Sequence, residues 1–323
     1  MALREMGRQA AANAVAPLPI LNGVGPSYLW LPRGSGGAMI HFLIEQFPAV
    51  GEAAWRSRMA RGQVVDGAGT RLLPDSVVRS GTRIWYYREL EAETAIPYQE
   101  RVLFQDAHLV VADKPHFLPM APAGRFLHET LLVRLKLTLG IDDLVPIHRL
   151  DRETAGVVLF SSNIASRGAY QSLFQKRQVS KVYEALAAPL EHLAWPHIHR
   201  SLMVEGTPFF RMQEVAGAPN SETSIHMTGM QGPLALYRLQ PHTGRKHQLR
   251  VHMASLGAPI ANDAFYPHAQ PCRGDDFTRP LQLLARSIAF VDPLSGEARE
   301  FASERRLGYD AESIAALTTA SMR

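Results

Sequence analysis

A single carboxylate stands among basic side chains near the middle of this chain. The stretch HRLDRETAG, residues 148–156, places Asp151 between Arg149 and Arg152 and leads into the apolar run VVLFSS. An aspartate in this setting can attack as a nucleophile or remove a proton as a general base. The neighbouring arginines favour a polyanionic partner. The stretch is therefore the first candidate for a catalytic site.

Two other kinds of catalytic site share features with this stretch, and each meets an objection. HRLD is close to the HRD of protein kinases, yet the chain has no glycine-rich loop after a first strand and no DFG, since residues 274–277 read GDDF. Asp151 and Glu153 could form the carboxylate pair of a glycosidase, but such carboxylates flank the scissile bond from opposite sides. Two acidic residues in one short loop do not suit that geometry, so both alternatives are disfavoured.

Histidines recur every five residues at His242, His247 and His252, which raises the question of a metal site. Five positions on a helix rotate the side chain by about 140°, and on a strand they reverse its face. Neither arrangement brings the three rings to one ion, and the chain has no cysteine pair to help. We therefore expect no metal.

After the kinase, the glycosidase and the metal site, a fourth interpretation remains for this stretch: a lone catalytic aspartate that works with a distant arginine and a tyrosine.

The bulk composition is that of an ordinary globular protein, with 46% hydrophobic and 20% charged residues in a length of 323. The single cysteine, Cys272, excludes an internal disulfide framework and fits a reducing compartment. The N-terminus lacks the sustained apolar core of a signal peptide, and no run of about 18 apolar residues predicts a membrane helix. We expect a cytoplasmic protein.

Basic residues concentrate in two stretches although the net charge is only +4. Residues 223–262 contain no Asp or Glu, and residues 147–181 hold six Lys and Arg against Asp151 and Glu153. This distribution indicates a polyanionic partner bound at a defined face, with two solvated surfaces as the alternative.

The chain is expected to form a small N-terminal domain and a larger C-terminal one. Residues 1–26, rich in Ala and Pro, predict a disordered lead. Residues 27–90 show a helical pattern, a basic helix and short strands, and predict a miniature domain. The acidic segment 91–100 predicts a linker, so residues 101–323 form the catalytic domain.

The C-terminal domain intersperses strands and helices. Strands are expected at HLVVADKP, AGVVLFSS, SKVYEALAAP and LALYRLQP, and helices at RFLHETLLVRLKLTLG, NIASRGAYQSLFQKRQ and TGRKHQLRVHMASLG. In the last helix Leu249, Met253 and Leu256 share a face, and Thr243 is placed to cap the start. Hairpin-like strand neighbours outnumber clean βαβ units. We therefore predict the α+β class, with a mixed, largely antiparallel central sheet flanked by helices.

Several stretches, in order, resemble the motifs of the RluA-type RNA pseudouridine synthases. They are VVADKP (110–115), HRLDRETAG (148–156), KVYEA (181–185), HTGRKHQLRVH (242–252) and APIANDAFY (258–266). The resemblance covers roughly residues 100 to 305 and implies the fold of that family. The family usually has Gly where Asn262 stands. Residues 27–90 are weakly similar to the small RNA-binding domain at the N-terminus of many of these enzymes.

The resemblance implies three catalytic residues: Asp151, Tyr183 and Arg250. Pseudouridine formation breaks the N-glycosidic bond of a uridine, turns the base and rejoins it through carbon five, and needs no cofactor. Asp151 would serve either as the nucleophile or as a base at the ribose, and both roles stay open. A carboxylate in a dry pocket needs an opposite charge, which Arg250 would supply. Tyr183 would stack on the base or handle a proton.

The same resemblance implies residues that bind the RNA. Arg149 would occupy the space left by a flipped uridine, and Leu249 would form an apolar wall against uracil. Apart from the resemblance, Arg245 and Lys246 add positive charge at the predicted helix N-terminus, where unpaired amides favour phosphate; the family usually has Ser or Thr where Lys246 stands. His148 and His247 complete the substrate-binding set.

The predicted activity is isomerisation of specific uridines in structured rRNA or tRNA by a monomer that needs no membrane or metal. The layout resembles the branch of the family that acts on a tRNA anticodon stem-loop and on large-subunit rRNA. A non-catalytic RNA-binding or folding factor on the same scaffold is the alternative. Retention of Asp151, Tyr183 and Arg250 together favours the enzyme, since binding alone would not require the trio.

Overall fold

The computed structural model describes residues 16–34, 36–270 and 276–308. The chain divides into two compact units, one ending at Glu93 and the other beginning at Thr94. The first 15 residues of the predicted disordered lead and the last 15 of the predicted catalytic domain lie outside the described residues. Within the described ranges, no helix is both long enough and apolar enough to cross a membrane.

The N-terminal unit combines a three-stranded antiparallel sheet with two helices. The strands β1 (Ser27–Trp30), β3 (Arg83–Tyr86) and β2 (Val64–Asp66) lie side by side in that order. Helices α2 (Met39–Gln46) and α3 (Glu52–Ala60) pack on them through Leu43, Trp55 and Met59, which are buried. This core gives the small unit an interior of its own.

Residues 16–26, at the end of the predicted lead, have a described path in this unit. Backbone bonds between Leu21 and Val24 close a turn, and the Tyr87 hydroxyl donates to the Pro19 carbonyl at 2.5 Å.

The C-terminal unit is built on one large mixed sheet. Its strands are β4 (Arg101–Gln105), β5 (Leu109–Lys114), β6 (Val145–Pro146), β7 (Ala155–Ser161), β8 (Val179–Ala187), β9 (His197–Glu205), β10 (Met212–Val215), β11 (Ser221–Gln231), β12 (Leu234–Pro241), β13 (Leu283–Val291) and β14 (Ala298–Ala302). The main order is β10-β9-β11-β12-β8-β13-β7-β5-β4, with β6 on β7 and β14 on β13. Only β13 and β7 pair in parallel among these strands. The predicted mixed, largely antiparallel sheet is confirmed.

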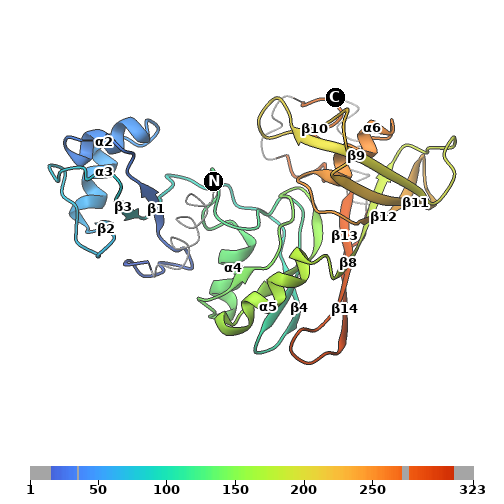
Figure 1. Cartoon of the computed structure of the whole chain (residues 1–323), viewed down its shortest axis with the longest axis horizontal. Coiled ribbons are helices and arrows are strands. Elements are labelled where there is room, and N and C mark those ends of the chain that lie inside the picture. Colours follow the sequence, from blue (N-terminus) through green and yellow to red (C-terminus); the bar gives the residue numbers. More distant parts are fainter. Residues whose placement is uncertain (1–15, 35, 271–275, 309–323) are drawn as a thin grey trace. The chain divides into compact units, whose positions relative to one another are not determined.

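Helices cover both faces of the sheet (Figure 1). Helix α4 (Leu131–Leu139) packs against Val110 and Val158, whereas α5 (Ile164–Gln175) packs against the alternate residues Val111 and Leu159. Alternate side chains of a strand point to opposite faces, so the two helices lie on opposite sides of β5 and β7. Both faces of β7 are thereby covered, which explains why every residue of the strand is buried.

Helix α6 (Gln248–Ser255) packs Leu249 and Met253 into a separate core with β8 and β12, as the predicted apolar face requires. Its predicted start was wrong. The helix begins only after His247, which has a left-handed φ of 55°. Thr243 does not cap it: its hydroxyl donates to Gln248 Oε1 at 2.7 Å and accepts from the Glu222 amide at 2.9 Å. Arg245 and Lys246 therefore lie in the turn before the helix rather than in its first turn.

Candidate active site

The loop that carries Asp151 is held tightly before it enters β7. The Ile147 amide donates to the Leu159 carbonyl at 2.9 Å, and the Thr154 amide donates to the Asp151 carbonyl at 3.2 Å. Gly156 follows with a φ of 117°, and a Cβ there would overlap the Ala285 carbonyl of β13. Only glycine fits this approach, so the small residue after the loop is a structural requirement.

Lys114, at the end of β5, also holds this loop in place through hydrogen bonds to backbone carbonyls. Its ammonium group is fully buried and donates to the carbonyls of Pro115, Leu118 and Arg152 at 2.9, 2.9 and 3.0 Å. Burial lowers the pKa of Lys114 to about 7, against the raising effect of Glu153 and Asp151. The predicted set of site residues did not include this lysine. The sequence feature that could have indicated it is a lysine directly before Pro115, at the end of an apolar strand.

Arg250 and Asp263 form a buried ion pair beside Asp151. Arg250 Nε donates to Asp263 Oδ2 at 2.8 Å and Nη2 donates to Oδ1 at 2.7 Å, and the two side chains are 1% and 0% exposed. The guanidinium also lies 4.8 Å from the ring centroid of Phe265. Asp263 and Phe265 fall within the stretch 258–266 quoted for the family resemblance, but neither was predicted as a site residue.

Asn262 turns the chain so that Asp263 enters this pair. Its φ is 63°, in the left-handed region that Gly and Asn tolerate best. The asparagine and the glycine usual in the family therefore meet the same backbone requirement.

Asp151 faces the one guanidinium nitrogen that Asp263 leaves free. Its Oδ2 lies 3.5 Å from Arg250 Nη1 and 3.8 Å from His247 Nε2. Glu153 Oε2 is 3.8 Å from the same Nη1, but Glu153 does not line the cavity described below. The predicted pairing of Arg250 with Asp151 thus exists as a looser contact, secondary to the pair with Asp263.

Tyr183 projects from β8 between the two apolar cores of the C-terminal unit. Burial, and secondarily the negative charge of Asp151, raise the pKa of its hydroxyl well above the usual value. The ring therefore stays neutral at physiological pH. Within the described ranges its hydroxyl has no hydrogen-bond partner, so it is available to a ligand.

These groups open onto a cavity of about 770 Å³, within the range typical of ligand sites. Its wall includes all nine predicted site residues: Asp151, Tyr183, Arg250, Arg149, Leu249, His148, Arg245, Lys246 and His247. Arg177 and Lys181 also line it and were not predicted. Segments before β7, within β8 and after β12 therefore meet at one basic cavity.

The predicted RNA-binding residues differ in how firmly the protein holds them. Arg149 is exposed, whereas Arg245 Nε donates to the Asn220 carbonyl at 3.2 Å. His247 Nδ1 lies 2.9 Å from the Tyr266 hydroxyl, and burial lowers the pKa of His247 to about 4. Lys246 is half-buried in the cavity wall.

The His148 side chain is held by contacts within the protein. Its Nε2 accepts the Leu159 amide at 3.1 Å, and its ring stacks on Phe174 at a centroid distance of 4.8 Å. Burial and the positive charge of Lys181 lower the pKa of His148 to about 4, so the ring is a neutral hydrogen-bond acceptor. Its contact with a ligand is limited to the part of the ring on the cavity wall.

Comparison with known proteins places these residues in a family. Residues 108–255 match the family model described as RNA pseudouridylate synthase. An uncharacterized RNA pseudouridine synthase of Synechocystis sp. is 28% identical over 71% of this chain and 79% of its own length. The dual-specificity RNA pseudouridine synthase RluA of Vibrio vulnificus is 33% identical over 62% of this chain and 80% of its own length.

Solved structures support the same fold. The human RNA pseudouridylate synthase domain containing 1 superposes with a TM-score of 0.54 at 20% identity, covering 71% of this chain and 98% of that one. At this identity the likeness concerns the fold alone.

Proposed function

The chain belongs to the RluA-type family of RNA pseudouridine synthases, and from this premise we propose that it isomerises specific uridines of structured RNA with Asp151 as the catalytic carboxylate. One observation carries the proposal. Asp151 faces a basic cavity while a buried arginine, held by another carboxylate, contacts only one of its oxygens. An aspartate of purely structural use would have its oxygens taken up by the fold.

Either role of Asp151 requires an unprotonated oxygen directed at the ribose. Covalent attack uses a lone pair of that oxygen at carbon, and base catalysis uses it to remove a proton. Arg250, fixed beside it, stabilises the negative charge without moving during the reaction. No atom is gained or lost when uridine becomes pseudouridine, so the proposed reaction draws on these side chains alone.

Tyr183 and Leu249 hold the base in this proposal. The neutral Tyr183 ring offers an aromatic face and a hydroxyl, and Leu249 lies on the same cavity wall. A detached uracil can turn against these surfaces while it remains in the cavity. Stacking of this kind is usual where proteins hold unpaired bases.

The basic rim binds the RNA backbone and assists base flipping. Arg149, Arg177 and Arg245 are exposed on the wall of the cavity, where a phosphate chain can reach them. Extruding a paired uridine costs a few kcal/mol, and a side chain in the vacated space offsets part of that cost. We assign this role to Arg149, which is exposed and lies two residues before Asp151.

The N-terminal unit is proposed as a second RNA-binding surface. Tyr28 and Trp30 occupy alternate positions of β1 and are 50% and 46% exposed. The Arg83 guanidinium lies 4.9 and 4.6 Å from their ring centroids. Aromatic rings beside an arginine suit the stacking of unpaired bases.

The proposed substrates are a tRNA anticodon stem-loop and large-subunit rRNA. The enzyme is proposed to act on them as a cytoplasmic monomer. Support comes from the sequence resemblance given above and from the Vibrio vulnificus relative, which is named for dual specificity. Mapping pseudouridines in total RNA from a deletion strain tests the choice of RNA. Loss of sites in only one RNA class would narrow the proposal to that class.

The proposed role of Asp151 is tested with Asp151→Asn, which replaces carboxylate by amide with almost no change in volume. RNA carrying tritium at carbon five of uridine should release it with the wild type, because that carbon forms the new glycosidic bond. The variant should bind the RNA as the wild type does and release no tritium, whereas the exposed control Asp142→Asn should keep full activity. A rate for Asp151→Asn within tenfold of the wild type would overturn the assignment. A non-catalytic RNA-binding factor would release no tritium even as the wild type.

A further inference from the structure

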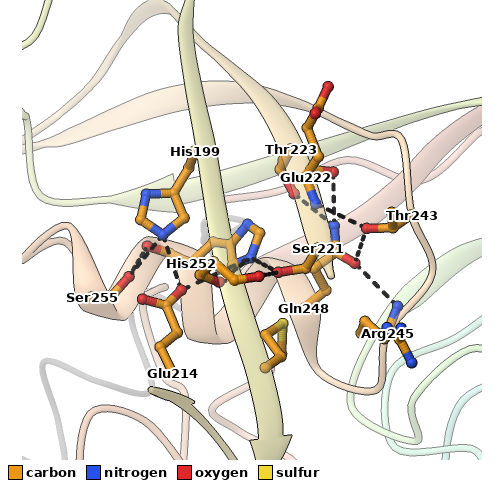
Figure 2. A network of polar contacts seen from close by, with 12 residues as sticks. His199, Glu214, Ser221, Glu222, Thr223, Thr243, Arg245, Gln248, His252 and Ser255 are labelled. Atoms are coloured by element: carbon orange, nitrogen blue, oxygen red, sulfur yellow. Dashed lines mark hydrogen bonds and ion pairs between the residues drawn. The ribbon is translucent and has the colours of Figure 1, made fainter. Parts of the chain in front are cut away.

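A second cluster of polar side chains lies away from the catalytic cavity. His199 on β9, Glu214 on β10 and His252 on α6 point toward one another (Figure 2). One ligand atom from each lies within 4.8 Å of the others. None of the three lines the cavity around Asp151. The family resemblance assigned them no role.

The spacing of their atoms fits a small divalent cation. Glu214 Oε1 lies 2.9 Å from His199 Nε2 and 3.8 Å from His252 Nε2. Zinc bonds of about 2.0–2.2 Å in a tetrahedral arrangement place ligand atoms roughly 3.4 Å apart. The 2.9 Å contact is a hydrogen bond that the ion would replace, and small side-chain rotations would bring both distances to that value.

Hydrogen bonds within the protein do not account fully for His252. The residue is completely buried, and its Nε2 lies 3.0 Å from Ser221 Oγ and 3.2 Å from Ser201 Oγ. Its other ring nitrogen, Nδ1, is buried and has no partner among the residues that the structure describes. The proposed ion would bind at Nε2 in place of these serine contacts, and Nδ1, on the other side of the ring, would then carry the proton of the neutral imidazole.

The cluster is accessible on one side. The side chains of His199 and Glu214 are 16% and 21% exposed, whereas His252 is 0% exposed. An ion can therefore enter past the first two residues and keep a water molecule as its fourth ligand. Two imidazoles and one carboxylate are a donor set that zinc uses with an open fourth position.

We propose that His199, Glu214 and His252 bind one Zn²⁺ ion, which joins strands β9 and β10 to helix α6. The role is structural, because the site lies outside the cavity where the reaction is proposed. Helix α6 also carries Arg250, so the ion steadies the element that positions the guanidinium beside Asp151. The expectation of no metal considered only histidines close in sequence, whereas two of these ligands come from strands far upstream.

Hydrogen bonds on either side of the Ser221–Glu222 peptide bond lead from the cluster toward the cavity wall (Figure 2). Ser221 beside His252 is followed by Glu222, whose carbonyl accepts from Gln248 Nε2 at 2.9 Å. Gln248 Oε1 accepts in turn from the Arg245 amide at 3.0 Å. The polar network thus links the surroundings of the ion to the basic turn before α6.

The test uses the full-length, untagged protein after removal of metal with a chelator. Zn²⁺ is titrated in competition with a chromophoric chelator, and thermal unfolding is followed with and without Zn²⁺. The wild type should bind one equivalent and unfold at a higher temperature when loaded. Mg²⁺, which prefers oxygen ligands, should not displace the zinc. Co²⁺ should give the visible absorption of a tetrahedral site.

Variants locate the ion. Glu214→Gln keeps the size of the side chain and should weaken Zn²⁺ binding on the order of 100-fold, while the metal-free protein keeps its circular dichroism. His252→Asn should abolish the cobalt spectrum. His226→Asn is the matched control, because His226 is an exposed histidine on β11, and it should bind Zn²⁺ as the wild type does.

Three results would overturn the proposal: no Zn²⁺ bound to the wild type, equal affinity in Glu214→Gln, or loss of binding in His226→Asn. If Glu214→Gln fails to fold, His199→Gln replaces it with the same expected loss of Zn²⁺ affinity. These measurements do not depend on catalysis, so they are independent of the proposed role of Asp151.

Discussion

Replacing Asp263 by asparagine is expected to damage both stability and activity, although Asp263 does not line the cavity. Its Oδ1 accepts from Arg250 Nη2 at 2.7 Å and from the Phe265 amide at 2.8 Å, and its Oδ2 accepts from Arg250 Nε at 2.8 Å. An asparagine can keep the first pair of bonds with its carbonyl. Its amide group must then face Arg250 Nε–H, so two donors meet and the opposite charge is lost.

The expected cost follows from the burial of this pair. Arg250 and Asp263 are 1% and 0% exposed, and breaking a buried ion pair by removing one partner costs about 3–5 kcal/mol. We therefore expect the free energy of unfolding of Asp263→Asn to fall by roughly that amount. The freed guanidinium would also move toward Asp151, and a misplacement of about 1 Å in an active site can reduce the rate on the order of 100-fold.

Chemical denaturation and single-turnover tritium release measure the two effects on the same preparations. Asp151→Asn serves as the comparison. Among the described residues the Asp151 carboxylate makes only the 3.5 and 3.8 Å ion-pair contacts, so its loss should affect activity far more than stability. The double variant Arg250→Met/Asp263→Leu should recover stability relative to Asp263→Asn while remaining inactive, since apolar pairs often replace buried ion pairs without loss. An Asp263→Asn protein with wild-type stability and rate would refute this reasoning.

Three further predictions concern residues around the cavity and in the N-terminal unit. Arg149→Ala should slow the reaction severely on a closed stem-loop and much less on an unstructured RNA of matched sequence; equal single-turnover losses on both would remove the flipping role. Trp30→Ala should weaken RNA binding, followed by fluorescence anisotropy, by about 1–3 kcal/mol, whereas the exposed Leu73→Ala should not. The pKa of His148 is lowered to about 4, whereas the same group in the unfolded chain has a pKa of about 6.5. The unfolded state therefore binds more protons between these values, and the free energy of unfolding should fall as the pH drops from about 6.5 to 4, less steeply in His148→Asn.

Two strands of the sheet were predictable from sequence because apolar residues dominate them. The runs that became β5 and β7 are buried along their whole length, and both were predicted as strands. Strands β9 and β11 were not predicted, because polar residues dominate HIHRSLMVE and SETSIHMTGMQ. Strands with one solvated face give a weaker apolar signal. These two pair with each other, and β9 also pairs with β10 while β11 also pairs with β12.

In the site, too, sequence motifs predicted some features correctly and local backbone structure incorrectly. Motif positions indicated Asp151 and Arg250, and the structure brings their side chains within 3.5 Å. The start of α6 was misplaced because a threonine before a basic run looked like a cap. In the fold Gln248 accepts the Arg245 amide, so the backbone is satisfied from within the turn. Local patterns cannot show such a choice, because it depends on Glu222 of β11 lying alongside and accepting from the same glutamine.

Asp263 explains how a buried arginine can lie beside the proposed catalytic carboxylate without occupying both of its oxygens. An arginine whose only partner was Asp151 would form a two-bond pair with it and occupy the oxygens that the proposed reaction needs. Asp263 takes Nε and Nη2 at 2.8 and 2.7 Å, which leaves only Nη1 at 3.5 Å from Asp151. The positive charge remains close enough to stabilise Asp151, while the longer contact leaves its carboxylate free to approach the ribose in the proposed reaction. The Asp263 carboxylate therefore determines how the Arg250 guanidinium contacts Asp151.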